Sequence, residues 1–511
     1  MSIEEILYIY SNIDAFFEKA RENFISLSYE DIRLIPHYSE IHPSEITLGT
    51  YLTRNIQLSH PLISAAMDTV TESKAAIVMA KSGGIGIIHK NFHPDPEIDI
   101  RLQVKEVNKV KHHLHGLVKN PIGFPKDITL GHLLDVKKQN DYKFSTFLVY
   151  DEDRLAGLVT RSVIKYNRHN PHVPLKDIMV RDVFTKEECS MAQAYQLMLK
   201  HQIGTIVMTD EEKHVKGLYT FTDVENLLCP HKNQYTLDQE GSLRVGAAIG
   251  IHDEERLDAL YQAGVDVVVV DSAHGDSKAV LSAFSRYKEK CSDLDFIVGN
   301  ISTENAAKRL IDHGVDAIKV GQGPGQICST RIISGIGVMQ ADAVHRVAKI
   351  SNPENVPVIA DGGIRYSGDI PIALACGAST VMLGQLLSGC EESPGERLQK
   401  KGKLYKIYRG MASLEAMASK GGSDRYLKKA QELKKLVPEG ITKRIPYKGF
   451  LEDQIFMLLE GTKAGLGYCG AINLGDFKKQ ARLVRIMTGG IHESHPDTKG
   501  MIENPPNYSS R

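Results

Sequence analysis

The sequence predicts an α/β protein of the (β/α)8 barrel class, also called a TIM barrel, interrupted by an inserted module that contains an internal repeat. Short apolar runs alternate with helical segments before residue 93 and again after about residue 241, which is typical of a parallel sheet. Two strand–helix units precede the interruption and six follow it, which gives the eight strands of a closed barrel. An open, doubly wound sheet is the competing architecture.

The predicted barrel strands are short, apolar and followed by polar or glycine residues. Two strands are expected before the insertion, within residues 61–68 and 84–88, with a helix at about 72–81 between them. Six more are expected at 245–249, 265–270, 296–298, 317–320, 356–360 and 380–383. Because barrel active sites lie at the carboxyl ends of the strands, the polar residues that follow these strands form the candidate site.

The predicted barrel comprises residues 1–92 and 231–511, and the inserted module comprises residues 93–230. Within the module, the segments 147–151 and 155–160 return as 205–210 and 215–220, and each copy is led by a helix, at about 130–138 and 190–201. The two copies, at about 110–170 and 178–230, resemble a tandem CBS module, which is a regulatory nucleotide-binding unit. Since the insertion interrupts a connection between strands and supplies no site residue, its removal is expected to leave catalysis intact.

The second copy of the repeat carries the ribose-binding pattern of CBS modules, Thr/Ser-x-x-Asp. Thr220 and Asp223 match this pattern, whereas the first copy has Val163 where the acid is expected. A carboxylate can accept hydrogen bonds from both ribose hydroxyls, and a valine cannot. The resemblance therefore implies one site for an adenine or guanine nucleotide. A purely structural repeat is the alternative.

The composition is that of a globular protein with room for two or three domains. The 511 residues are 42% hydrophobic and 24% charged, and the formal net charge of -1 indicates neither a nucleic-acid nor a membrane-surface partner. Seven cysteines show no Cys-x-x-Cys pair and no zinc spacing, so we expect a reducing, cytoplasmic location. We see no signal-peptide pattern and no apolar run of about 18 residues that would span a membrane.

A glycine-rich loop with one cysteine follows the strand expected at 317–320. Residues 321–331 read GQGPGQICSTR, and three glycines in five residues let the backbone approach a ligand closely. A thiol at a strand end, beside exposed N–H groups, can lose its proton and become a nucleophile. Cys328 is therefore the candidate nucleophile. An inert cysteine in a structural loop is the alternative.

The last two predicted strands end in glycines at positions where such barrels commonly hold a phosphate. Asp361 is followed by two glycines after the seventh strand, and Gly384 follows the eighth. Arg409, beside a glycine turn, offers a further anion contact. Residues 421–426 and 437–440 flank a lysine-rich stretch, which predicts a mobile lid within about 400–450. A solvated lysine-rich loop is the alternative to this lid.

These motifs resemble the family of inosine-5′-monophosphate (IMP) dehydrogenases over nearly the whole chain. The stretches that carry the resemblance are 62–68 (LISAAMD), 83–91 (GGIGIIHKN), 323–331 (GPGQICSTR), 360–365 (ADGGIR), 408–411 (YRGM), 425–426 (RY) and 439–440 (EG). The resemblance implies NAD-dependent oxidation of IMP to xanthosine 5′-monophosphate, a step of guanine nucleotide biosynthesis. It also implies that Cys328 attacks C2 of the hypoxanthine, that a hydride passes to NAD, and that water hydrolyses the covalent thioimidate.

The resemblance assigns roles residue by residue. Arg425 is expected to activate water, with Tyr426 beside it on the lid, and Thr330 with Glu439 is expected to form a second proton relay. The IMP-binding residues are expected to be Ser64, Met67, Gln326, Asp361, Gly362, Gly363, Gly384, Gln385, Tyr408, Arg409, Gly410, Met411, Ala412 and Glu439. The residues of the NAD site are expected to be Asp271, Ser272, Asn300, Gly321, Gln322 and Gly323.

The resemblance also implies a bound potassium ion and a homotetramer. Carbonyl groups of Gly323, Gly325 and Cys328 would supply half of the ligands, and Glu493, Ser494 and His495 of a neighbouring subunit would supply the rest. Because one chain offers only half of this site, the resemblance implies a tetramer; pairing of tetramers into an octamer stays open.

Three substrate-site residues depart from the usual family sequence. Gln326 and Gln385 stand where serines usually contact the phosphate, and Ala412 stands where glycine is usual. Two other functions are weighed: a GMP reductase, which uses NADPH and releases ammonia from GMP, and a non-catalytic nucleotide sensor. Arg425 and Tyr426 favour the dehydrogenase, because a reductase does not need to activate water. An intact Cys328 argues against the sensor.

Overall fold

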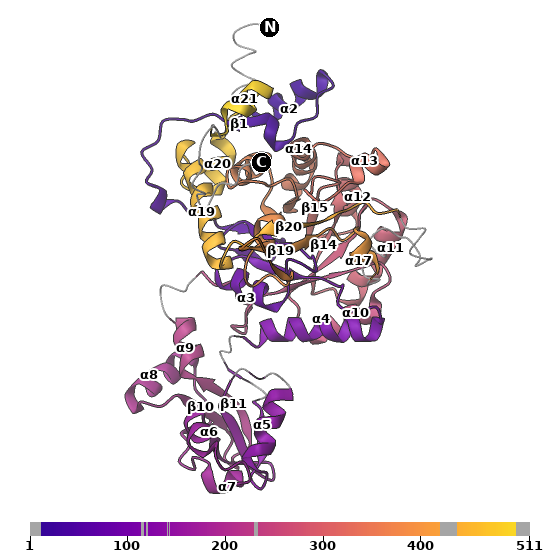
Figure 1. Cartoon of the computed structure of the whole chain (residues 1–511). Coiled ribbons are helices and arrows are strands. Elements are labelled where there is room, and N and C mark those ends of the chain that lie inside the picture. The colour runs from indigo at the N-terminus through magenta and orange to yellow at the C-terminus, as the bar shows by residue number, and fades with distance from the viewer. Residues whose placement is uncertain are drawn as a thin grey trace. The chain divides into compact units, whose positions relative to one another are not determined.

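The computed structural model describes residues 12–113, 117–118, 121–139, 142, 144–228, 234–418 and 437–496. The chain forms two compact units (Figure 1). One unit combines Met1–Lys111, Gln234–Leu237 and Leu243–Arg511, and the other combines His112–Asn233 with Asp238–Ser242. Among the helices in these described ranges, none has both the length and the apolar character that a membrane span requires.

The first unit contains a closed barrel of eight parallel strands, which confirms the predicted fold class. Around the barrel the strands are β12 (Gly246–Ile249), β13 (Val267–Asp271), β14 (Asp295–Ile301), β15 (Ala317–Val320), β16 (Val358–Asp361), β17 (Thr380–Leu383), β4 (Leu62–Ser64) and β5 (Ile85–Ile88). The pairing of β17 with β4, through Met382 and Ile63, and that of β5 with β12 close the sheet. The open-sheet alternative is therefore wrong.

The barrel strands are buried on both faces, as parallel strands covered by helices are. Alternate residues such as Ile85 and Ile87, or Val267 and Val269, point into the barrel and pack there with Ile297. The connecting helices are α3 (Ser73–Lys81), α4 (Pro96–Lys111), α10 (Glu254–Gln262), α11 (Lys278–Lys290), α12 (Glu304–Asp312), α13 (Thr330–Ser334), α14 (Gln340–Ser351), α15 (Asp369–Ala375) and α16 (Gln385–Ser388).

Further elements of the first unit extend the barrel at its ends. A small antiparallel sheet joins β18 (Arg397–Lys400), β19 (Lys403–Arg409) and β20 (Thr442–Pro446), and β1 (Ile32–Leu34) pairs with β21 (Leu483–Arg485). A hairpin joins β2 (Thr50–Tyr51) and β3 (Gln57–Leu58). The remaining helices are α2 (Ile13–Glu22), α17 (Leu414–Ala418), α19 (Leu451–Tyr468), α20 (Leu474–Gln480) and α21 (Thr488–Glu493).

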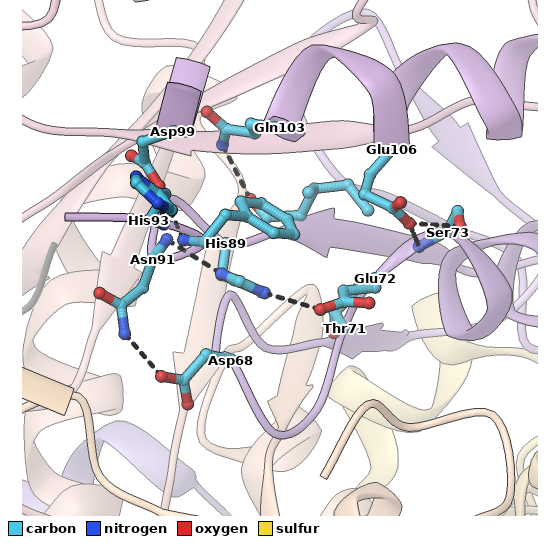
Figure 2. A network of polar contacts seen from close by, with 12 residues as sticks. Asp68, Thr71, Glu72, Ser73, His89, Asn91, His93, Asp99, Gln103 and Glu106 are labelled. Atoms are coloured by element: carbon cyan, nitrogen blue, oxygen red, sulfur yellow. Dashed lines mark hydrogen bonds and ion pairs between the residues drawn. The ribbon is translucent and has the colours of Figure 1, made fainter. Parts of the chain in front are cut away.

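Helix α4 belongs to the barrel unit, so the second unit begins at His112 and not near residue 93. Figure 2 shows three polar side chains of this helix, Asp99, Gln103 and Glu106. Gln103 donates to the carbonyl groups of Ile88 (3.3 Å) and Ala248 (2.9 Å), which ties α4 to the ends of two barrel strands. Arg256 of α10 donates to Asp99 at 2.5 Å and to Gln103 at 2.7 Å. These buried contacts make α4 the helix that covers β5 and β12.

This boundary changes the expected outcome of a deletion. A chain in which a short Gly-Ser linker replaces residues 112–233 is expected to fold and to keep its catalytic rate, because every barrel element remains. A deletion of 93–230 removes α4 together with Asp99 and Gln103, so Arg256 keeps only its contact with Asp253, and the loss of this buried pairing costs about 3 kcal/mol or more. Urea unfolding and steady-state kinetics of both chains test this. Equal stability of the two would contradict the assignment of α4 to the barrel.

In the second unit, the repeated segments form two three-stranded sheets of the same topology. The first contains β6 (Gly123–Pro125), β7 (Phe147–Asp151) and β8 (Arg154–Val159), and the second contains β9 (Thr185–Lys186), β10 (Thr205–Thr209) and β11 (Val215–Thr220). The accompanying helices are α5 (Leu130–Gln139), α6 (Arg161–Asn167), α7 (Leu175–Ile178), α8 (Met191–His201) and α9 (Phe221–Leu228). Leu148 and Leu158 of one copy share a hydrophobic cluster with Val207 and Leu218 of the other.

Candidate active site

Cys328 lies at the carboxyl end of β15, in a loop that main-chain hydrogen bonds hold at several points. Its N–H donates to the Gly325 carbonyl at 2.9 Å, and the N–H of Ser329 donates to the Glu439 carbonyl at 2.8 Å. The N–H of Ile441 donates back to the carbonyl of Ile327 at 2.9 Å. The half-buried cysteine is therefore fixed between its own tight turn and the segment around Glu439.

Glycine is required where the loop leaves β15. Gly321 has a φ of +151°, and a Cβ there would lie 2.1 Å from the Asp361 carbonyl oxygen at the end of β16. Gly323 has a φ of +77°, and a Cβ there would lie 2.6 Å from Cγ of Arg331. Arg331 in turn donates to the carbonyl of Gln322 at 3.1 Å. The glycines thus bring two strand ends together and make room for the arginine that fixes the loop.

A cavity of about 970 Å³ opens in front of Cys328, and most of the predicted IMP-binding residues line it. They come from the Cys328 loop, from the ends of β16 and β17, and from the segments at 408–412 and 439–440. The predicted residues in its lining are Met67, Gln326, Asp361, Gly362, Gly363, Gly384, Gln385, Tyr408, Gly410, Met411, Ala412 and Glu439. The structure therefore brings into one cavity residues that lie far apart in the sequence.

A second cavity, of about 1090 Å³, also borders Cys328. The predicted NAD-site residues in its lining are Ser272, Asn300, Gly321, Gln322 and Gly323, whereas Asp271 lines the first cavity. Cys328 and Glu439 line both cavities, and Thr330 lines the second. The Cys328 sulfur lies 3.1 Å from Thr330 Oγ1, within hydrogen-bonding distance. The thiol thus stands where ligands in the two cavities would meet.

Two residues that were predicted to bind IMP form hydrogen bonds to other side chains of the protein instead. Ser64 is buried in β4 and accepts a hydrogen bond from Thr71 Oγ1 at 2.8 Å. Arg409 donates to the Asp68 carboxylate through Nε (3.0 Å) and Nη2 (2.7 Å), and this partner raises the pKa of Arg409. Asp68 also accepts from Asn91 at 2.6 Å (Figure 2). Arg409 therefore joins the end of β19 to the loop after β4, and its fork is not free for an anion.

Lys319, which was not predicted as a site residue, is fully buried and lines the first cavity. Its ammonium group lies 2.9 Å from Asp271, 3.1 Å from Asp361 and within hydrogen-bonding distance of Asn300 Oδ1. Asn300 also donates to Asp361 at 2.9 Å. One cation therefore holds Asp361, which was predicted to bind IMP, and Asp271, which was predicted to bind NAD. A lysine at an inward position of an otherwise apolar strand was the available signal for this role.

The two glutamines that depart from the usual family sequence both face the first cavity. Gln385 Oε1 is buried and has no hydrogen-bond partner within the described part of the chain. Beside it, a Cβ on Gly384 would lie 2.7 Å from the Tyr408 hydroxyl, so the strand end and the tyrosine are in close contact. Burial raises the pKa of Tyr408 well above its usual value, so its hydroxyl stays protonated. The Oε1 atom of Gln385 is therefore available to accept a hydrogen bond from a ligand.

Several predicted site residues lie elsewhere or outside the described residues. Arg425 and Tyr426 fall in the undescribed stretch 419–436. Glu493 ends α21, the Ser494 hydroxyl donates to the Gly490 carbonyl at 2.6 Å, and the His495 ring lies against Tyr366 with centroids 5.7 Å apart. In the described ranges, no three His, Cys, Asp or Glu side chains cluster as a metal site. The predicted potassium ligands are mainly carbonyl groups, which are oxygen donors of the kind a hard cation prefers.

The predicted regulatory residues lie at the start of α9 in the second unit. The Thr220 hydroxyl donates to the Asp223 carboxylate at 2.6 Å and accepts from the Asp223 N–H at 3.3 Å. Burial raises the pKa of Asp223. In the first copy, Thr160 accepts from the N–H of Val163 at 3.4 Å, so both threonines cap a helix. Only the second copy adds a carboxylate at that place.

Comparison with known proteins identifies the family. Residues 26–497 match the family model described as IMP dehydrogenase / GMP reductase domain. The inosine-5′-monophosphate dehydrogenase of Aquifex aeolicus is 43% identical over 94% of this chain and 97% of its own length, and that of Chlorobaculum parvum is 42% identical over 95% and 98%. A solved GMP reductase from Trypanosoma brucei, in complex with guanosine 5′-monophosphate, superposes with a TM-score of 0.85 at 33% identity, covering 93% of this chain and 98% of that one. The chain belongs to the IMP dehydrogenase / GMP reductase family.

Proposed function

We propose that the protein is an IMP dehydrogenase, which oxidises IMP to xanthosine 5′-monophosphate with NAD as the hydride acceptor. The observation that carries this proposal is the position of Cys328 between two cavities, one lined by the predicted nucleotide residues and one by the predicted dinucleotide residues. The relatives that share more than 40% identity over nearly the whole chain are inosine-5′-monophosphate dehydrogenases. The enzyme would supply xanthosine monophosphate for guanine nucleotide synthesis.

The first half of the reaction uses the thiol of Cys328. Its sulfur would bond to C2 of the hypoxanthine in the first cavity, and Thr330 Oγ1, 3.1 Å away, would accept the thiol proton while passing its own proton to the Glu439 carboxylate. NAD bound in the second cavity would accept the hydride that leaves C2. The intermediate that remains would be a thioimidate, in which C2 of the purine is bonded to the sulfur of Cys328. Glu439, which lines both cavities, is placed to hydrogen-bond the purine ring and so to keep C2 next to the sulfur.

The second half of the reaction releases the product. Water adds to C2, the carbon–sulfur bond breaks, and the sulfur recovers its proton. We assign activation of this water to Arg425 with Tyr426, and we assign the second proton relay to Thr330 with Glu439. A carboxylate and a hydroxyl near the reacting carbon can move the proton that an arginine alone holds tightly.

The remaining groups would bind the ends of the substrate and of the cofactor. Asp361 would bind the IMP ribose, and the backbone N–H groups at Gly362, Gly363 and Gly384, which line the same cavity, would bind the phosphate. Gln326 and Gln385 add side-chain amides at the same end of the cavity. Because Arg409 is already paired with Asp68, phosphate affinity rests on these amides and on the backbone. Asp271, which Lys319 holds at 2.9 Å, would hold the nicotinamide ribose.

We also propose the bound ion, the oligomeric state and the regulation that the family resemblance implies. A potassium ion would be bound by carbonyl groups of Gly323, Gly325 and Cys328 and by residues 493–495 of a neighbouring subunit in a homotetramer. Asp223 would bind a purine nucleotide at the inserted CBS-type unit and change assembly or cooperativity. The cytoplasmic location rests on the cysteine pattern, and the described cysteines are all free.

The related reductase activity is the second candidate, because a similar solved structure is a GMP reductase. The protein mixed with IMP, NAD and potassium chloride is expected to produce NADH, measured by absorbance, and xanthosine monophosphate. The matched reaction contains GMP and NADPH. Oxidation of NADPH with release of ammonia, and no NADH in the first reaction, would overturn the dehydrogenase.

A further inference from the structure

A third cavity, of about 960 Å³, lies at the opposite end of the barrel from Cys328. It borders the turns that enter β16 and β17, around Asn352 and Gly377, at the amino-terminal ends of these strands. Helices α2, α14 and α20 provide the other walls. None of the residues predicted for IMP, NAD, potassium or the regulatory nucleotide lines it.

The side chains around this cavity are strongly basic. Four cations line it, Lys349, Lys478, Lys479 and Arg482, against the single acid Asp14. The other titratable side chains in the lining are His345 and Cys376. A concave surface lined by one sign of charge attracts and concentrates ions of the opposite sign.

The acid in the cavity does not neutralise the cations on α20. Asp14 Oδ1 lies 2.8 Å from Nε2 of His345 on α14. Lys349, on the same helix, pairs at 2.5 Å with Glu18 of α2. Both contacts join α2 to α14. The positive charges of α20 therefore face the cavity without an opposite charge from the described protein.

Lys478 is the most informative of these side chains. It is half-buried, and it has no hydrogen bond or ion pair with any described residue. Burial lowers the pKa of Lys478 to about 8. An ammonium group without a partner in such a place is unfavourable, and a bound anion would offset that cost. The Lys478 ammonium group is thus a donor that a bound anion could use.

Arg482 adds a second donor with fixed geometry. Its Nη1 donates to the carbonyl groups of Lys479 (2.9 Å), Gln480 (3.0 Å) and Ala481 (2.9 Å), which anchors the guanidinium at the end of α20. Within the described chain, Nε and Nη2 have no partner. Arginine presents such N–H groups in a fork that suits phosphate-like oxyanions.

We propose that this cavity is a binding site for a small tetrahedral oxyanion, such as the phosphate group of a metabolite, held by Lys478, Lys479 and Arg482. The anion would join α20 to the turns that enter β16 and β17. The site is separate from the nucleotide cavity and is independent of the proposed reaction.

Calorimetric titration of the full-length protein with sulfate, at constant ionic strength, tests this site. Lys478→Met is expected to weaken the sulfate affinity of the cavity about tenfold, which corresponds to the loss of one charge-assisted hydrogen bond. Lys308→Met is the matched control, because it removes one charge from an exposed position on α12. Lys479→Met, also exposed, is expected to weaken binding too and serves if the first variant does not fold.

A proton measurement separates this site from any other sulfate contact. At pH 8, sulfate is expected to cause proton uptake in the wild type, because the anion raises the pKa of Lys478, and no uptake in Lys478→Met. Burial lowers the pKa of His345 and raises that of Cys376, so neither titrates near this pH. Unchanged sulfate affinity in both Lys478→Met and Lys479→Met would overturn the proposal. Acetate binding as tight as sulfate would overturn the tetrahedral preference.

Discussion

Cys328→Ala is expected to abolish turnover while leaving nucleotide binding intact. The sulfur is the only protein group of the proposed mechanism that forms a bond to C2, so its loss should reduce kcat by roughly 10⁴-fold or more. IMP affinity should change little, because the loop is held by main-chain hydrogen bonds of residues 325–329 and not by the thiol. Steady-state kinetics and calorimetric IMP titration measure the two quantities.

The control for this substitution is Cys189→Ala. Cys189 is also half-buried, but it lies in the second unit, so kcat is expected to stay within about twofold of the wild type. Turnover that survives in Cys328→Ala would remove the nucleophile from the account. Loss of both turnover and IMP binding would mean that the loop had collapsed.

Lys319→Met is expected to destabilise the barrel and to damage both ligand sites. It removes the buried cation that lies 2.9 Å from Asp271 and 3.1 Å from Asp361, and leaves two carboxylates close together without compensation. Breaking a buried ion pair on one side costs about 3 kcal/mol of unfolding free energy. Because both carboxylates lose their fixed positions, kcat/KM should fall by about 10²-fold.

A double variant distinguishes charge from packing at Lys319. Adding Asp271→Asn to Lys319→Met removes one uncompensated charge and is expected to recover about 1 kcal/mol of stability without recovering activity. Urea unfolding of the two single variants and the double variant gives the coupling. Additive effects would show that Lys319 acts through its volume and not through its charge.

The sequence predicted the barrel well because parallel barrel strands are buried on both faces. Each of the eight strands was therefore a short apolar run with a polar end, and every observed strand overlaps its expected residues. The residue at which the second unit begins was harder to predict from the sequence. Helix α4 is mostly polar, and its role depends on contacts of Gln103 and Asp99 with residues more than a hundred positions away. Sequence periodicity does not reveal such contacts.

The candidate site, like the fold, was predicted in part from the sequence. Glycine-rich strand ends and Cys328 could be located, because those residue types at barrel ends have few other uses. The partners of charged groups could not be located. Arg409 was predicted to contact an anion, but its guanidinium group is bonded to Asp68. Lys319 was assigned only to an apolar strand, although it joins three polar side chains. A local pattern can mark a buried charge, as the lysine in an apolar strand does, but it does not name the partner, because pairing is a property of the fold.

Mass spectrometry of the protein trapped with IMP and NAD tests the central claim most directly. Rapid acid quench during turnover, followed by proteolysis, should reveal a purine nucleotide adduct on the peptide that contains Cys328, two hydrogen mass units below the mass of simple IMP addition, since a hydride and a proton have left. The adduct should be absent without NAD. A protein that turns over and yields unmodified Cys328, or an adduct on another residue, would contradict the account.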